Sequence, residues 1–215
     1  MSNEYVLNQL CERHPLLNSV KTAIGEAALM IIKCYSGGGK LLVCGNGGSC
    51  SDSEHIVGEL MKSFELARPV NKDISEKLAE ISVDRGKYLA QKLESGLPAI
   101  SLSSQTSLTT AISNDLGSDL VFAQQVIGYG CGKDVLIAIS TSANSQNVVD
   151  ACITAKAMNM RVIGLTGMAG GKMKRYCDIQ INVPEKRTSF IQELHLPVLH
   201  TICLIIENHF FGNHI

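Results

Sequence analysis

Residues 41–55, LLVCGNGGSCSDSEH, decide the fold of this chain. The apolar run 41–44 is short enough for a buried strand, and a helix is expected from about Asp52 to Met61. Between them lies Gly45-Asn46-Gly47-Gly48-Ser49. A strand, a glycine-rich turn and a helix start can together bind an anion, because glycines let the backbone approach a ligand and helix N–H groups favour negative charge. The turn matches neither the dinucleotide motif nor the P-loop, so a plain tight turn is the alternative.

Four further apolar runs follow this segment and are separated by helical patterns. They cover residues 98–103, 134–139, 161–166 and 178–183. Apolar strands that alternate with helices indicate a parallel sheet covered on both faces. We therefore predict an α/β fold, with a five-stranded parallel, doubly wound sheet in a single domain, 1–215. Ligands of such sheets bind beyond the carboxyl ends of the strands, so the turn 45–49 and the loop 140–145 are expected at the same edge.

Two helical regions flank the predicted sheet or interrupt it. Residues 2–35 read as helical, with Pro15 starting a second helix. That helix has an apolar stripe, which packs either on the domain or against another subunit, and we predict a subunit contact. The segment 70–96 has charged residues and helical spacing, and reads as one or two amphipathic helices inserted before the second strand. The stripe consists of Val20, Ile24, Ala27, Ala28, Ile31 and Ile32.

Composition excludes several classes of protein. The 215 residues have a net charge of −1, which gives no electrostatic basis for binding nucleic acid or an anionic membrane. The sequence shows neither an uninterrupted apolar run of membrane-span length nor a signal peptide. None of the eight cysteines forms a C-x-x-C motif, and several lie within apolar segments. We therefore expect buried free thiols and a cytoplasmic protein.

The loop after the third strand is rich in hydroxyl groups. Ser140, Thr141, Ser142 and Ser145 come directly before a predicted helix. Hydroxyls and helix N–H groups at a strand end can hold a phosphate without lysine or arginine. An N-cap with turn serines is the alternative.

His55 and Glu59 lie four residues apart and share one helical face. Such a pair can bind a metal or transfer protons, although a solvated surface pair is the common alternative. The C-terminal helix offers companions, because polar groups interrupt its apolar sequence at a cost unless they meet a ligand, a metal or partners. These groups are Gln192, Glu193, His195 and His200.

Taken together, the motifs resemble the sugar isomerase (SIS) domain family, and within it most closely the phosphoheptose isomerases. They occur in family order through nearly the whole chain. The matching stretches are Cys44-Gly45-Asn46-Gly47-Gly48-Ser49, His55-x-x-x-Glu59-Leu60, Ser113-Asn114-Asp115, Ser140-Thr141-Ser142-x-Asn144-Ser145, Leu165-Thr166-Gly167, Gly170-Gly171-Lys172-Met173 and Gln192-Glu193-x-His195 with His200.

The resemblance implies a phosphosugar isomerase that converts sedoheptulose 7-phosphate into D-glycero-D-manno-heptose 7-phosphate through an enediol. Glu59 and His200 would be the acid–base residues. It further implies zinc, one ion per site, bound by His55, Glu59, Gln192 and His200, and a homotetramer with sites at subunit contacts. The residues that would contact the phosphosugar are Asn46, Gly47, Gly48, Ser49, Asn114, Asp115, Ser140, Thr141, Ser142, Ser145 and Gln192.

Three features depart from the family pattern. Ala143 replaces a usual glycine in the phosphate loop, Ser189 replaces a frequent acidic residue near the sugar, and the insertion 70–96 is additional. Moreover, Gln192 and His200 are about 12 Å apart on an intact helix, so one metal would need a distorted helix or a second subunit. The insertion leaves another sugar phosphate open as substrate. A noncatalytic SIS module that binds a phosphosugar or a protein is the other alternative, although such a module needs neither Glu59 nor His200.

Overall fold

A five-stranded parallel sheet forms the centre of the protein, in the order β2-β1-β3-β4-β5. The computed structural model describes residues 2–212. The fold class and all five predicted strands are confirmed, with boundaries that shift by one or two residues. The strands are β1 (Leu41–Gly45), β2 (Ala99–Ser101), β3 (Val135–Ser140), β4 (Arg161–Gly167) and β5 (Ile179–Val183).

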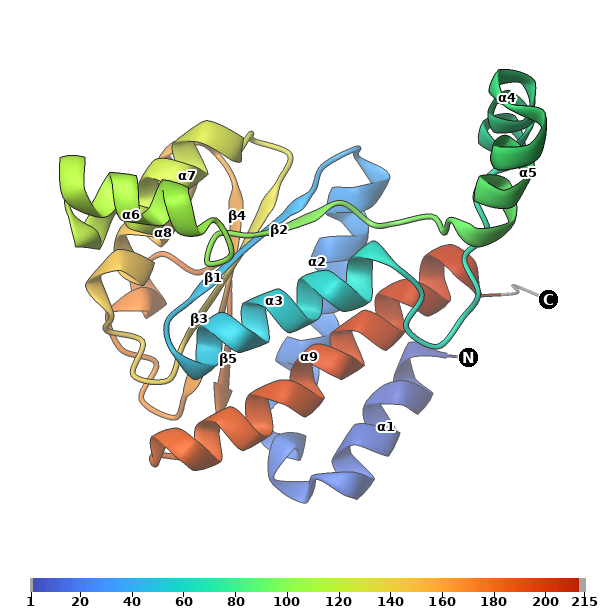
Figure 1. Ribbon diagram of the computed structural model, residues 1–215. Coiled ribbons are helices and arrows are strands. Elements are labelled where there is room, and N and C mark those ends of the chain that lie inside the picture. The colour runs from blue at the N-terminus through green and yellow to red at the C-terminus, as the bar shows by residue number, and fades with distance from the viewer. Residues whose placement is uncertain (1, 213–215) are drawn as a thin grey trace.

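Helices cover both faces of the sheet (Figure 1). One face carries α2 (Lys21–Ser36), α3 (Gly48–Met61) and α9 (Thr188–Phe211), and the other carries α6 (Thr106–Asp115), α7 (Val121–Tyr129) and α8 (Gln146–Ala157). Successive strand residues point to opposite faces, so Leu41 and Val43 join the first core while Leu42 and Cys44 join the second. Burial on both faces explains why these strands are continuous apolar runs. Two short 3₁₀ helices, η2 (Ser118–Leu120) and η3 (Lys172–Arg175), complete the second side.

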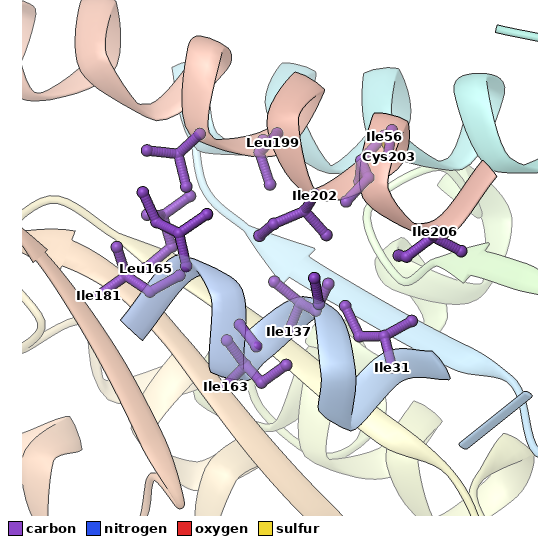
Figure 2. Packing of buried hydrophobic residues seen from close by; sticks show 14 of the residues in the cluster. Ile31, Ile56, Ile137, Ile163, Leu165, Ile181, Leu199, Ile202, Cys203 and Ile206 are labelled. Atoms are coloured by element: carbon purple, nitrogen blue, oxygen red, sulfur yellow. The ribbon is translucent and has the colours of Figure 1, made fainter. Parts of the chain in front are cut away.

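The first core holds α9 firmly against the sheet. Leu199, Ile202 and Ile206 of this helix point toward the strands, as Figure 2 shows. Ile137 and Ile163 are register partners in β3 and β4 and are each 1% exposed. Burying one such side chain contributes roughly 1.5–3 kcal/mol. The polar residues of α9 are therefore carried on a rigid support.

The N-terminal helices pack on their own chain, which corrects one prediction. They comprise α1 (Asn3–Arg13), the 3₁₀ helix η1 (Pro15–Val20) and α2. Ile24 and Ile31 are 0% exposed and Val20 is 9% exposed, all within the first core. Because β5 and α9 already cover this stripe, the prediction that it packs against another subunit is wrong. An apolar stripe shows that a face is buried, but not which element covers it.

Two segments have the length and apolar composition of a membrane span, contrary to the sequence expectation. They are Pro15–Ser36, with mean hydropathy 1.2, and Thr188–Phe211, with mean hydropathy 1.5. This is weak evidence for a span, since the core helix of a globular domain passes the same test. The buried apolar side chains of both segments belong to the first core, whereas Leu16, Leu29, Phe190 and Leu196 are exposed.

The insertion forms a helical hairpin that projects from the body of the protein (Figure 1). Its helices are α4 (Lys72–Ile81) and α5 (Val83–Lys92), as predicted from the sequence. They cross closely at Gly86, where a Cβ atom would lie 1.7 Å from the carbonyl oxygen of Leu78. No side chain of α4 is buried. The hairpin therefore adds little to the core of the domain.

Candidate active site

The glycine-rich turn brings the start of α3 close to the sheet. This helix begins at Gly48, four residues before the predicted start at Asp52. Gly47 has a φ of +56°, which favours glycine. A Cβ atom at Gly45 would lie 2.5 Å from the carbonyl oxygen of Ser49. The turn therefore needs glycine where the backbone is left-handed and where two backbone segments touch.

The loop between β3 and α8 faces this turn. The Oγ atoms of Ser140 and Ser145 are 3.2 Å apart. Two reciprocal hydrogen bonds of 2.9 Å between the side-chain amides of Asn46 and Asn147 tie the start of α8, which directly follows the loop, to the glycine turn. Ala143 takes a φ of +54°, in the left-handed region that the family usually fills with glycine. Ala143 therefore adopts a left-handed backbone conformation despite its Cβ atom.

A cavity of about 270 Å³ lies between the two loops and the start of α9. Most of the predicted phosphosugar contacts therefore come together. Asn114 and Asp115 lie exposed on α6, and Ser142 accepts a 3.2 Å hydrogen bond from the amide of Asn144; none of the three lines the cavity. The sequence did not predict Thr188 as a lining residue. The next residue, Ser189, which departs from the family pattern, is exposed. The lining residues are Asn46, Gly47, Gly48, Ser49, Ile139, Ser140, Thr141, Ser145, Thr188 and Gln192.

The Gly170–Met173 motif supports the hydroxyl-rich loop from behind. The amide of Met173 donates to the carbonyl oxygen of Ala143 at 3.2 Å, and the amide of Lys172 donates to Asn144 Oδ1 at 3.0 Å. A Cβ atom at Gly171 would lie 2.6 Å from the Ala143 oxygen. The loop therefore depends on a glycine 28 residues further along the chain.

His55 and His200 meet where α3 and α9 run side by side (Figure 1). Their Nε2 atoms are 2.8 Å apart, so one ring must donate and the other accept. Glu59 Oε1 lies 3.8 Å from His55 Nε2. Burial and the neighbouring His55 lower the pKa of His200. The structure thus places the two predicted acid–base residues, Glu59 and His200, next to the same ring nitrogen of His55.

The remaining polar residues of these helices differ in role. His195 is fully buried, and burial lowers its pKa to about 4, so this imidazole is neutral. It belongs to the packing of α9 rather than to the acid–base group. Asp52 precedes His55 by one helical turn, and burial raises its pKa to about 6. Sequence reasoning assigned Asp52 no role, because nothing in a sequence reports the burial of one carboxylate.

The predicted zinc ligands divide into two groups. Imidazole nitrogens and a carboxylate, as in His55, His200 and Glu59, are ligands that zinc prefers. Gln192 instead lies against Gly48, where a Cβ atom would be 2.4 Å from its Nε2 atom. The helix α9 continues unbroken between Gln192 and His200. Within residues 2–212, no three His, Cys, Asp or Glu side chains are gathered closely enough to hold a metal ion.

Comparison with known proteins agrees with this geometry. The SIS domain model matches residues 8–90 and 75–167. The chain belongs to the SIS domain family. A phosphoheptose isomerase from Helicobacter pylori is 40% identical over 194 residues, which cover 90% of this chain and 88% of that protein.

Two solved structures of phosphoheptose isomerases are similar to this chain over most of its length. The phosphoheptose isomerase of Neisseria gonorrhoeae superposes with a TM-score of 0.72 at 33% identity, covering 95% of this chain and 98% of the other. The one from Francisella tularensis gives 0.75 at 30% identity, covering 97% and 100%. Membership of this family and its isomerase relatives identify the chain as a phosphosugar isomerase.

Proposed function

We propose that this SIS enzyme interconverts sedoheptulose 7-phosphate and D-glycero-D-manno-heptose 7-phosphate through an enediol. One observation carries the proposal: a cavity lined by amides and hydroxyls lies at the start of α3 and α9, and the histidine–glutamate group lies further along the same helices. The names of the relatives support the choice of a heptose phosphate.

In this proposal, the substrate phosphate binds between the glycine turn and the loop 140–145. The N-termini of α3 and α8 lie at these two segments, and helix N-termini stabilise anions. Ser140, Thr141 and Ser145 add hydroxyl donors at the cavity wall. Holding one end of an open-chain sugar converts proton transfer at the other end into an intramolecular step.

In this proposal, the reacting carbons of the sugar lie at Glu59 and His200. His55 is seven residues beyond Gly48 on α3, which is about 10 Å along the helix axis. That separation suits an extended sugar chain with its phosphate at the far end. Glu59 would remove the proton from one carbon while His200 serves the neighbouring oxygen, and the pair would then act in reverse on the adjacent carbon.

Zinc is part of the proposal. His55, Glu59 and His200 carry the groups that would bind it, with Gln192 as a further donor, but they are not gathered into a metal site within residues 2–212, so these side chains would have to move together when the ion binds. When bound, the ion would polarise the substrate carbonyl. Because Gln192 lies near Gly48 in its own chain, a second subunit is the simplest source of that donor. The proposal therefore includes a homotetramer whose sites are shared between subunits. The eight free cysteines support a cytoplasmic location.

The test is an assay of purified protein with a panel of ketose phosphates. Aldose formation is followed with and without a chelator, and the metal content and sedimentation of the same sample are measured. We expect turnover of sedoheptulose 7-phosphate and a loss of activity with chelator. Turnover of a different ketose phosphate alone would change the substrate assignment. Binding without turnover of any substrate would favour a noncatalytic phosphosugar sensor.

A further inference from the structure

An ion pair between Arg68 and Glu207 lies outside the proposed proton-transfer group. The Arg68 side chain is 0% exposed and that of Glu207 is 1% exposed. Arg68 Nη2 lies 2.7 Å and Nε 2.8 Å from Glu207 Oε1. A buried charge is costly unless it is paired and fully hydrogen-bonded. Such a pair in the core needs an explanation beyond stability, because apolar residues would fill the same space at least as well.

Arg68 completes the end of the helix that carries Glu59. Its Nη1 atom donates to the carbonyl oxygen of Leu60 at 2.8 Å, and its Nη2 atom to that of Glu59 at 3.2 Å. The last carbonyl groups of a helix have no partner within the helix, and a cation there complements the helix dipole. The guanidinium therefore fixes the backbone of Glu59 itself.

Glu207 organises the loop that follows α3. Its Oε1 atom accepts a hydrogen bond from the amide of Phe64 at 2.8 Å, and its Oε2 atom accepts from the amides of Glu65 at 2.9 Å and Leu66 at 3.1 Å. These bonds together with Arg68 lower the pKa of Glu207 against the opposing effect of burial. One carboxylate thus holds three successive amides and the guanidinium.

The same loop reaches His200. The Phe64 ring lies 5.3 Å from the His200 ring, centroid to centroid. Glu207 follows His200 by seven residues on α9, so both side chains share one face of the helix. The loop is therefore attached to α9 at Glu207 and contacts His200 through Phe64.

We propose that Arg68 and Glu207 are positioning residues, which set the distance and orientation between Glu59 and His200. This inference rests on the proposed function. Arg68 fixes the Glu59 end of α3, Glu207 fixes the connecting loop to α9, and Phe64 limits the rotation of the His200 ring. The ion pair also lies at the base of the helical hairpin, where the amide of Ser95 donates to the carbonyl oxygen of Arg68 at 2.6 Å.

The test compares Glu207→Gln with Asp134→Asn. Asp134 is also 1% exposed and paired with a lysine, and it accepts the amides of Lys40 and Cys131 at 2.9 and 2.8 Å. It lies directly before β3, and the partners of its carboxylate, Lys40 and Cys131, belong neither to α3 and α9 nor to the loop of Phe64. Both variants lose one buried charge and are expected to lower the melting temperature, but only Glu207→Gln touches the loop of Phe64.

We expect Glu207→Gln to lower kcat by about tenfold to a hundredfold, the effect of a small misplacement of reacting groups. KM should change by less than about threefold, because the cavity loops are untouched. Asp134→Asn should retain the wild-type kcat when both are assayed well below their melting temperatures. An unchanged kcat in Glu207→Gln, or an equal loss in both variants, would overturn the proposal.

Two further measurements keep the outcome decisive. If Glu207→Gln does not fold, Phe64→Leu replaces it, and an unchanged kcat in that variant refutes the positioning role. If the wild type turns over no phosphosugar, the proposed function fails, and hydrogen exchange then tests the ion pair alone. Faster exchange over residues 59–68 in Glu207→Gln, but not in Asp134→Asn, is the expected result. Equal exchange would overturn the inference.

Discussion

Replacing Gly171 with alanine tests whether the Gly170–Met173 motif shapes the proposed phosphate loop. Gly171 has a φ of +46° and a ψ of −154°. This backbone region is essentially confined to glycine and costs another residue roughly 1–3 kcal/mol. The new Cβ atom would also lie 2.6 Å from the carbonyl oxygen of Ala143 and 2.7 Å from that of Ser142. Both contacts are with backbone, so the loop must move.

The expected effect combines a stability change and a binding change. A cost of about 3 kcal/mol lowers the melting temperature by about 6–12 °C in a domain of this size. Displacing one hydrogen-bond donor from the phosphate costs about 1.5–3 kcal/mol, or roughly a tenfold to hundredfold rise in KM. Turnover at saturation should change much less, because Glu59 and His200 lie beyond this loop on α3 and α9.

Gly38→Ala is the matched control. Gly38 also has a positive φ, +75°, but a Cβ atom there would meet no heavy atom within 4 Å. The control should lose about 1 kcal/mol and keep its KM, as measured by thermal melting and steady-state kinetics. If Gly171→Ala has a wild-type KM, or if the control shows the same rise, the motif does not shape the phosphate site.

Three further predictions follow. Glu59→Gln should lower turnover at least about a hundredfold, the usual loss for a general base, while phosphosugar affinity measured by calorimetry stays near the wild-type value. Near-normal turnover with metal bound would show that Glu59 is not the base. Asp134 should lose its stabilising effect as pH falls, because hydrogen bonds from Lys40 and Cys131 outweigh burial and hold its pKa below the usual value. Its contribution to stability is present above about pH 4 and lost below that, so the melting temperatures of wild type and Asp134→Asn should converge in acid. A constant difference between the two melting temperatures would contradict this. Replacing residues 72–92 by a short glycine–serine linker should shift the melting temperature by only a few degrees, because α4 has no buried residue and α5 has only Gly86. A large loss of stability would show that the hairpin supports the core.

Periodicity along the chain was sufficient to predict the sheet and the hairpin. Continuous apolar runs mark strands that are buried on both faces, and β1, β3 and β4 are such strands. The charged, amphipathic segment 70–96 could be predicted as helical for a similar local reason. The glycine turn and the hydroxyl loop could also be placed together, because the carboxyl ends of parallel strands share an edge.

Only the tertiary structure decided which partners each buried face meets. The stripe of Ile24 and Ile31 has the same periodicity whether it packs on β5 or on another subunit, so its interior position had to come from the fold. Asn114 and Asp115 fit the family motif in order, yet α6 places them away from the 270 Å³ cavity within one chain.

The sequence by itself determined the elements, their alternation and the chemistry available at the strand ends, because these depend on neighbours along the chain. The tertiary structure decided the pairings across long separations: His55 with His200, 145 residues apart, and Arg68 with Glu207, 139 residues apart. Nothing local distinguishes Glu207 from a solvated glutamate near a helix end. Its low exposure and its four partners exist only after α9 packs beside α3, because burial and hydrogen bonding are properties of the assembled core.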